Sequence, residues 1–450
     1  MRRAKSAERM ESVGTEDCGI LTAMRNASLL TIVSLILVPF VAQAFSWKAK
    51  TAREEKVALI EFLNGTQVAK EQTAALVARL VAQSNTTDWM QSAIDFGSEL
   101  LRQTEGQTAV DPLRRLALET IDYPLHVDNY GPRIVPAEMT AFNDMVVRYA
   151  REAKDRVLRE VREAQVPEGE LWIWRIYNMA FVLKGPRHTV AIDFTNRPEL
   201  IAKPYSELLK DFNSAIKSGK GPKTFDFHAG APQVWSETDW QAFADVVDIA
   251  FVTHPHGDHT SEPFLREMMR LKKPLVLPGD ILCRAQVGGK PQVNWVPFTT
   301  RETCHKLTLD HSEPIDIGGI SIRNFLGNQG KGVPCNVYLL EIDGVRIVDN
   351  GDNYARDKEK MLENAPPADV IIASTWNQVN HILGCVQKAE GFNPQTAAFL
   401  PAHENELGHS VNHRESYHEM YTDPNRLGNS VFPLERTFPL GWGECFKFRR

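Results

Sequence analysis

One short stretch, from Thr253 to Thr260, constrains this chain more than any other. It reads Thr-His-Pro-His-Gly-Asp-His-Thr, and it follows the apolar run Val246 to Val252, which predicts a buried strand. On an extended backbone the first two histidines point to the same side, while the aspartate and third histidine point to a second spot close by. Four ligand-type residues within six positions argue against an ordinary polar loop and favour two neighbouring metal ions. The candidate ligands are His254, His256, Asp258 and His259.

The His-x-His-x-Asp-His pattern resembles the signature of the metallo-β-lactamase fold superfamily. The resemblance extends from about Glu170 to the C-terminus. It implies an α/β fold, a four-layer αββα sandwich of the metallo-β-lactamase type, with the metal ligands on loops at strand ends. The N-terminal part lies outside the resemblance and is predicted to be an all-α region.

The resemblance also implies ligands outside the motif. In the family a Gly-Asp after one strand supplies a bridging carboxylate, and a histidine beyond a later strand is the last ligand; Asp352 and His403 match these positions. Where the family has a further histidine, Asn328 or Gln329 stands as a substitute ligand. The residues expected to support the ligands by hydrogen bonding are Asp193, Glu404 and His409.

This ligand set predicts a metal-dependent hydrolase with two unequal metal sites. One ion would have four protein ligands, whereas the other would have two imidazoles, the shared carboxylate and an amide oxygen. Nitrogen and carboxylate ligands without thiolate suit zinc first, with iron or manganese as alternatives. A metal-activated hydroxide, formed because the ion lowers the pKa of water to about 7, would attack an ester, lactone, amide or phosphodiester. Asp258 would be the catalytic proton acceptor.

Two other functions stay open at this point. The missing histidine is compatible with a degenerate metallo-β-lactamase-fold protein that binds or scaffolds without turnover, although six of the seven usual ligand positions are filled. An iron oxidoreductase of the same fold would need a flavin or rhodanese domain, and the sequence shows neither. A serine hydrolase is set aside because the sequence has no Gly-x-Ser-x-Gly elbow.

The N-terminal residues 1–44 predict a signal peptide. The apolar stretch from Ser28 ends in Ala-Gln-Ala, so we expect cleavage after Ala44, with Met24 as an alternative start. The protein would then be exported, to the periplasm or the medium. A membrane anchor formed by residues 28–44 is the alternative, although a span of roughly 17 residues is at the short end.

The remaining chain predicts two parts. Residues 45–166 show helical periodicity without ligand patterns, and residues 167–450 form the expected catalytic domain. The helical region is expected to pack on the catalytic domain or to mediate a homo-oligomer. A small molecule is the expected substrate. The net charge of −6 gives no excess of basic residues with which to bind a nucleic acid.

Overall fold

The computed structural model describes most of the chain after residue 50. The described residues are 51–83, 88–131, 133–195, 198, 200–218, 228–279, 282–287, 290–297, 303–330, 333–353, 360–375, 379–407, 411 and 414–450. All of them belong to one compact unit. The leader predicted at residues 1–44 and the supporting residue His409 lie outside these ranges.

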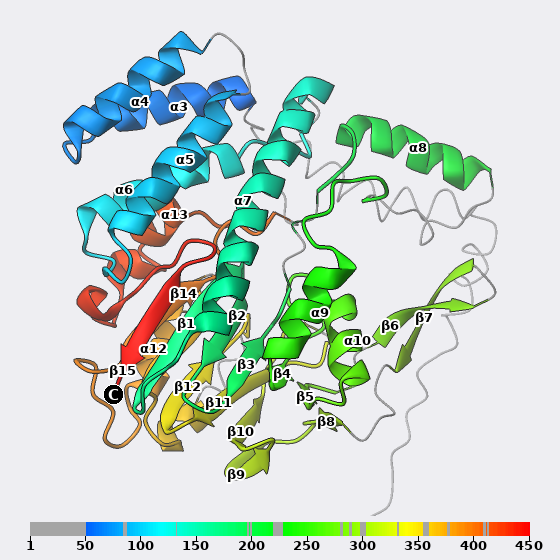
Figure 1. Ribbon diagram of the computed structural model, residues 1–450, viewed down its shortest axis with the longest axis vertical. Helices are drawn as coiled ribbons and strands as arrows, with labels where there is room; N and C mark the ends of the chain where they lie inside the picture. Colours follow the sequence, from blue (N-terminus) through cyan, green and yellow to red (C-terminus); the bar gives the residue numbers. More distant parts are fainter. Residues whose placement is uncertain are drawn as a thin grey trace, which may run out of the picture. The chain divides into compact units, whose positions relative to one another are not determined.

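Five helices in the described chain precede the first strand (Figure 1). They are α3 (Ala52–Gly65), α4 (Lys70–Ala82), α5 (Asp88–Gln103), α6 (Pro112–Leu125) and α7 (Pro136–Glu163). Local signals place their starts: Thr51 and Glu54 form a capping box on α3, and the side chain of Asp111 caps α6. The all-α region expected from the sequence is therefore present, and the first strand begins at Glu170.

The first sheet has seven strands, in the order β15-β1-β2-β3-β4-β5-β8. Their bounds are β1 (Glu170–Tyr177), β2 (Ala180–Lys184), β3 (Thr189–Ile192), β4 (Ile249–Phe251), β5 (Leu275–Leu277), β8 (Cys304–Lys306) and β15 (Cys445–Arg449). The strand predicted from Val246 to Val252 is shorter than expected, because α9 (Glu237–Val246) continues to Val246. β3, β4 and β5 are parallel, so their carboxyl ends lie at the same end of the sheet.

The second sheet has six strands, in the order β14-β13-β12-β11-β10-β9. Their bounds are β9 (His311–Ile317), β10 (Ile320–Leu326), β11 (Asn336–Ile342), β12 (Val345–Asp349), β13 (Val370–Ser374) and β14 (Ala398–Ala402). β12, β13 and β14 are parallel. A separate hairpin, β6 (Leu282–Val287) with β7 (Lys290–Pro297), was not predicted from the sequence.

An apolar core between the two sheets shows which face of each strand is turned inward. Alternate residues such as Ile173 of β1 and Ile372 of β13 belong to this core, whereas their neighbours Trp174 and Ile371 belong to a second cluster shared with the helices. This alternation is the period-two pattern of strands in face-to-face sheets. The predicted αββα layering is confirmed.

Helices cover the outer sides of both sheets. α7 packs against β1, and α10 (Glu262–Arg270) packs against β5 and α9 (Figure 1). α12 (Val379–Val386) shares its hydrophobic cluster with the outer residues of the second sheet. The remaining helices are α8 (Tyr205–Lys217), α13 (Tyr417–Thr422), and the 3-10 helices η2 (Lys360–Asn364), η4 (Leu427–Asn429) and η5 (Leu434–Arg436).

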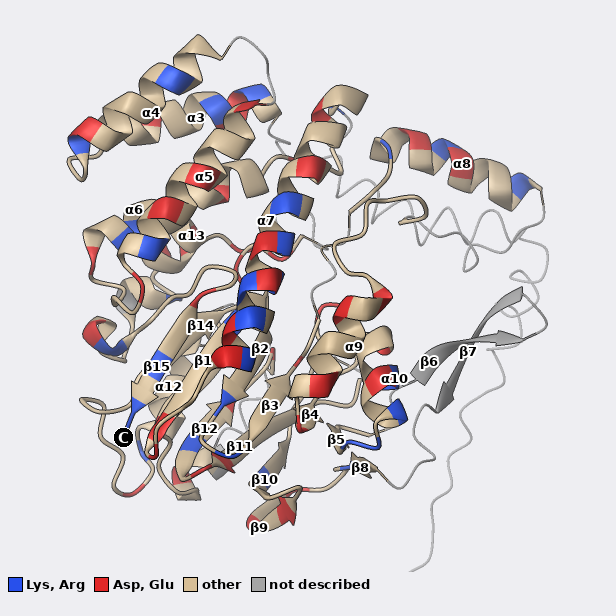
Figure 2. Cartoon of the chain, in the orientation of Figure 1, with Lys and Arg blue, Asp and Glu red and all other residues tan. Residues whose placement is uncertain are grey.

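Charge and hydropathy of the described residues fit a folded core with a mixed polar exterior. Figure 2 shows basic and acidic residues interleaved along α7, so this long helix carries no face of one sign. Among the described residues, none of the helices combines the length and the apolar character that a membrane span requires.

Candidate metal centre

The loop that follows β4 is fixed by one buried carboxylate, Asp193, which comes directly after β3. Its Oδ1 accepts a hydrogen bond from the backbone N–H of Thr253 (2.7 Å), and its Oδ2 accepts one from the Thr253 hydroxyl (2.6 Å). Oδ2 also lies 2.7 Å from Nδ1 of His259. The parallel strands β3 and β4 end side by side, and this contact holds the His259 ring with Nε2 facing Oδ2 of Asp352.

Four of the predicted ligands converge in front of that ring. The ligand atoms of Asp258, His259, Asp352 and His403 all lie within 4.8 Å of one another, and we call these residues the four-residue cluster. Oδ2 of Asp352 is 3.0 Å from Nε2 of His259 and 3.0 Å from Nε2 of His403. Oδ2 of Asp258 is 3.3 Å and 3.4 Å from the same two nitrogens.

The parallel strands of the second sheet explain how residues so distant in sequence meet. Asp352 follows β12 and His403 follows β14, and the two strands are linked through β13 in parallel register. Their carboxyl ends therefore face the carboxyl ends of β3 and β4. The backbone N–H of Asn336, at the start of β11, bonds the Thr253 carbonyl at 2.8 Å and ties the two sheets together here.

The other two predicted ligands, His254 and His256, form a histidine pair beside the cluster. Nε2 of His254 is 3.0 Å from Nδ1 of His256, and the ring centroids of His254 and His259 are 3.9 Å apart. Two imidazole nitrogens on one tetrahedral zinc ion lie about 3.3 Å apart, given Zn–N distances of about 2.0–2.1 Å. The pair thus has a separation suited to a shared ion, although His256 is exposed whereas His254 is buried.

Electrostatics in the cluster favour charged groups of both signs. Burial disfavours a charged ring, but the carboxylates of Asp352 and Asp258 outweigh it and hold the pKa of His259 well above its usual range. The pKa of His403 is raised in the same way, and the two imidazoles in turn hold the pKa of each carboxyl well below its usual range despite burial. The site therefore retains two carboxylates where a cation would be bound.

The residues present fit a divalent cation. Oδ1 of Asp352 is buried and accepts no hydrogen bond from any described residue, which is costly unless another group meets it. The cluster offers two imidazoles and two carboxylates without thiolate, the donor set of zinc, iron or manganese. A carboxylate behind the His259 ring is the arrangement that usually supports a metal-bound imidazole.

The substitute ligands predicted at positions 328 and 329 are not brought to the histidine pair by any described contact. Oδ1 of Asn328 accepts the backbone N–H of Gly330 at 2.9 Å, so this oxygen faces its own loop. The Asn328 backbone N–H donates to Oδ1 of Asn353 at 2.7 Å. Gln329 is half-buried in the same loop.

The carboxylate near His403 is not the one expected. Among the described residues, Glu404 bonds Nη1 of Arg175 (3.0 Å) and the hydroxyl of Thr375 (2.8 Å). Oε1 of Glu415 instead lies 3.7 Å from Nδ1 of His403, and burial raises the pKa of Glu415 to about 8. Sequence reasoning missed Glu415, because no local pattern connects it to a strand end.

Backbone strain is concentrated around the cluster. Asp193 (φ +44°), His403 (φ +83°) and Asn405 (φ +60°) all adopt left-handed conformations. A Cβ at Gly351 would come within 2.6 Å of the Thr253 hydroxyl oxygen, so only glycine fits one residue before Asp352. Non-glycine residues keep a left-handed conformation only where the surrounding structure imposes it, and such backbone strain often marks a functional site.

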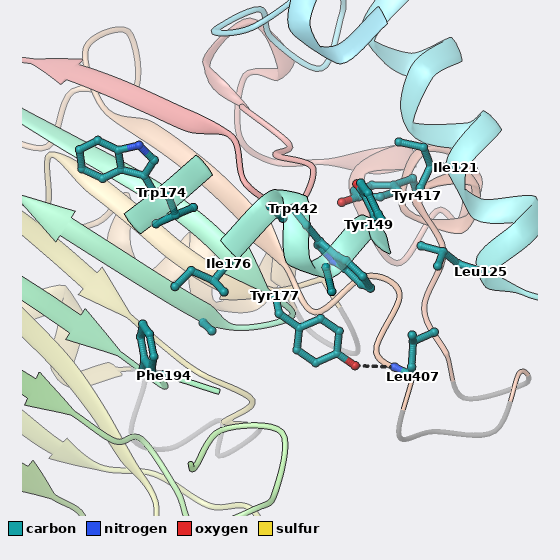
Figure 3. Close-up of a cluster of buried hydrophobic side chains, with 14 of the residues drawn as sticks. Ile121, Leu125, Tyr149, Trp174, Ile176, Tyr177, Phe194, Leu407, Tyr417 and Trp442 are labelled. Carbon is teal, nitrogen blue, oxygen red and sulfur yellow. Dashed lines mark hydrogen bonds between the residues drawn. The ribbon is translucent and has the colours of Figure 1, made fainter. Parts of the chain in front are cut away.

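The helical region holds the segment that carries His403. Asp122 of α6 accepts hydrogen bonds from the side chain of Asn405 (3.0 Å) and from the backbone N–H of Tyr417 and His418. The hydroxyl of Tyr177 accepts the Leu407 N–H at 2.7 Å, as Figure 3 shows beside the apolar side chains of α6 and β1. Hydrogen bonds to α6 of the helical region and to Tyr177 of β1 thus hold the segment that follows His403.

Comparison with known proteins finds similar solved structures but no similar sequence. No protein-family profile and no curated protein sequence matches the chain. Among solved structures, a metallohydrolase of Ignicoccus hospitalis is 16% identical, with 62% of this chain and 99% of that chain covered and a TM-score of 0.36. An isothiocyanate hydrolase from gut bacteria of Delia radicum is 15% identical over 62% and 99%, with a TM-score of 0.38.

A metallo-β-lactamase fold protein of Bacillus subtilis is also similar, with 12% identity over 62% of this chain and 99% of that chain and a TM-score of 0.33.

Proposed function

We propose that this protein is a metal-dependent hydrolase whose centre is the four-residue cluster. The observation that carries the proposal is the convergence of Asp258, His259, Asp352 and His403 within 4.8 Å, at strand ends from both sheets. A merely structural ion pair would not need two imidazoles and two carboxylates at the same strained loops. The resemblance of the motif supports the same conclusion.

The chemistry follows from the residues around the ion. When bound, a zinc-type ion supplies a water of lowered pKa and polarises a carbonyl or phosphoryl oxygen of the substrate. Asp258, whose side chain is 15% exposed while both imidazoles of the cluster are fully buried, is the carboxylate placed to meet a substrate and accept a proton. Esters, lactones, amides and phosphodiesters are the substrate classes.

Zinc is the first candidate metal, with iron or manganese as alternatives, and we propose one tightly held ion. The cluster provides four buried or nearly buried ligands, whereas the histidine pair provides two, one of them exposed. The second ion would therefore bind more weakly.

Export and a small-molecule substrate belong to the same proposal. The apolar run ending at Ala44 supports cleavage before Phe45, and the interleaved surface charges give no footprint for a nucleic acid. N-terminal sequencing of the protein from its host should begin near Phe45. An intact leader in a membrane fraction would replace export with anchoring.

The central test measures metal content and hydrolysis on the same preparations. Purified protein should contain close to one equivalent of metal and should hydrolyse one or more members of a panel of chromogenic esters, lactones, phosphodiesters and β-lactams. Dialysis against a chelator should remove activity, and added zinc should restore it. His188, which bonds Asp343 through Nδ1 at 2.7 Å away from the cluster, supplies the control His188→Ala. Bound metal without any hydrolysis would favour a binding protein instead.

A further inference from the structure

Asn178, in the turn between β1 and β2, contacts the four-residue cluster directly. Its Nδ2 donates a hydrogen bond to Oδ2 of Asp258 at 3.3 Å. The same oxygen of Asp258 faces the Nε2 atoms of His259 and His403, at 3.3 Å and 3.4 Å. Asn178 therefore contacts the Asp258 oxygen that faces both imidazoles of the cluster.

The conformation of Asn178 is fixed from behind by Arg175 of β1. Nε of Arg175 donates to the Asn178 carbonyl at 3.0 Å. Nη1 of the same guanidinium donates to Oε2 of Glu404 at 3.0 Å and to the Leu440 carbonyl at 2.8 Å. Arg175 and Glu404 are both fully buried, and Glu404 directly follows His403. One guanidinium thus links the turn behind Asp258 to the loop of His403.

We propose that Asn178 is a positioning residue of the metal centre, which fixes the inward oxygen of Asp258, and that Arg175 holds this turn and the His403 loop in one arrangement. The inference rests on the proposed metal-binding function. A carboxylate oxygen can bind an ion through one lone pair and accept an N–H through the other. Partners of this kind orient a ligand and tune its affinity for metal.

The identity of residue 178 supports a role for the side chain. Its φ of +38° lies in the left-handed region, where glycine is the least strained choice and asparagine is tolerated. The side chain is nevertheless present, fully buried, and its Oδ1 has no hydrogen-bond partner among the described residues. A buried amide with one satisfied end is costly, so its retention is explained by the bond that Nδ2 makes to Asp258.

Asn178→Gly is the sharpest test, because it removes the amide without straining the backbone. Metal-free protein is titrated with Co²⁺, and both the dissociation constant and the visible d–d spectrum are recorded. We expect the affinity to fall by about 10–100-fold, as for other residues that orient ligands, and the spectrum to change shape because Asp258 binds differently. The melting curve of metal-free Asn178→Gly should remain cooperative.

Asp343→Gly is the matched control. Asp343 also has a positive φ (+50°) in a hairpin turn, between β11 and β12. That turn precedes β12, whereas Asp352 follows it, so the five-residue strand separates the turn from the cluster. The control should keep the wild-type Co²⁺ affinity and spectrum, even if its melting temperature falls because contacts to Arg187 and His188 are lost.

The outcomes separate this inference from the proposed function. Wild-type protein that binds no Co²⁺ would overturn the proposed function itself. Wild-type protein that binds Co²⁺, together with Asn178→Gly of unchanged affinity and spectrum, would overturn only the role of Asn178. Should Asn178→Gly fail to give folded protein, Asn178→Asp keeps the size of the side chain and tolerates the left-handed backbone, but it replaces the N–H donor with a carboxylate oxygen. A changed Co²⁺ spectrum is again expected, and an unchanged affinity and spectrum would overturn the role of Asn178.

Discussion

The two halves of the candidate metal centre differ in how the fold supports them. In the four-residue cluster each imidazole is fully buried and has a carboxyl group near its far nitrogen, Asp193 behind His259 and Glu415 near His403. In the histidine pair Nδ1 of His254 lies near the Thr253 hydroxyl and not near a carboxylate of the described residues, and His256 is exposed. A metal site is defined by its supporting residues as much as by its ligands, so the two halves should differ in affinity.

The largest effect is expected from removing a ligand of the cluster. His403→Ala should abolish both bound metal and hydrolysis, because it strips the better site. His256→Ala is the matched comparison, since it removes an imidazole from the weaker half; it should leave close to one equivalent of metal. Metal analysis by mass spectrometry measures both. Equal loss of metal in the two variants would show that the halves do not differ.

Deleting the helical region should damage the cluster more than the histidine pair. A chain that begins near Pro167 lacks α6, whose Asp122 and neighbouring carbonyls hold the segment after His403; Arg414 also bonds Asn129 at 2.8 Å. We expect lost solubility or activity, because the buried apolar stripes of α5, α6 and α7 lose their cover. Sedimentation and metal analysis of this fragment provide the measurement. A stable, monomeric and active fragment would mean that the helices are an independent module.

A single substitution in α6 tests the hydrogen bonds between the helical region and the His403 segment without deleting the helices. Asp122→Ala removes the acceptor for Asn405, Tyr417 and His418, leaving buried donors unpaired at a cost of about 1–3 kcal/mol each. Metal occupancy should fall together with the melting temperature, because Asn405 lies two residues from His403. The exposed Glu152→Ala on α7 serves as control and should change neither quantity. Unchanged occupancy in a destabilised Asp122→Ala would separate these hydrogen bonds from the site.

The carboxylate behind His259 should matter less than a ligand but more than a surface group. Asp193→Asn keeps the size of the side chain but weakens its hold on the His259 ring and on Thr253. A loss of about 10–100-fold in metal affinity is expected, as for other residues that orient ligands. Competition with a chromogenic chelator measures it. Wild-type affinity would indicate that Thr253 alone holds the loop.

The contrast between local and distant contacts explains what the sequence could predict. The His254–His259 motif, the sandwich and the helices follow from local patterns and from a resemblance that rests on adjacent residues. Asn178 contacts Asp258 across 80 positions, and Glu415 approaches His403 only through folding, so no period or spacing marks either. Strand β15 was likewise not predicted, because its sequence is short and only its pairing with β1 identifies it as a strand.

The boundary between α9 and β4 shows a second kind of error. The run from Val246 to Val252 is apolar except for Asp248, and short apolar runs do not distinguish the end of a helix from a strand. α9 continues to Val246, and the Val247 N–H closes the helix on the Phe243 carbonyl at 3.1 Å. The strand could therefore be located but not bounded, whereas the start of α9 has a local signal, since Ser236 is a residue type that favours the N-cap position it occupies.

The smallest expected effect comes from strengthening the weaker half. Gln329→His adds an imidazole near the position where the superfamily that the motif resembles usually has one, and imidazole binds zinc better than an amide oxygen. We expect metal content to rise from close to one toward two equivalents, with little change in the first binding step. Gln329 is preferred over Asn328 because the Asn328 amide already bonds Gly330 and its backbone holds Asn353. Glu341→His, on an exposed position of β11, controls for adventitious binding by a new histidine. If wild-type protein already holds two ions tightly, the histidine pair is completed by another residue, and the inequality between the two halves is wrong.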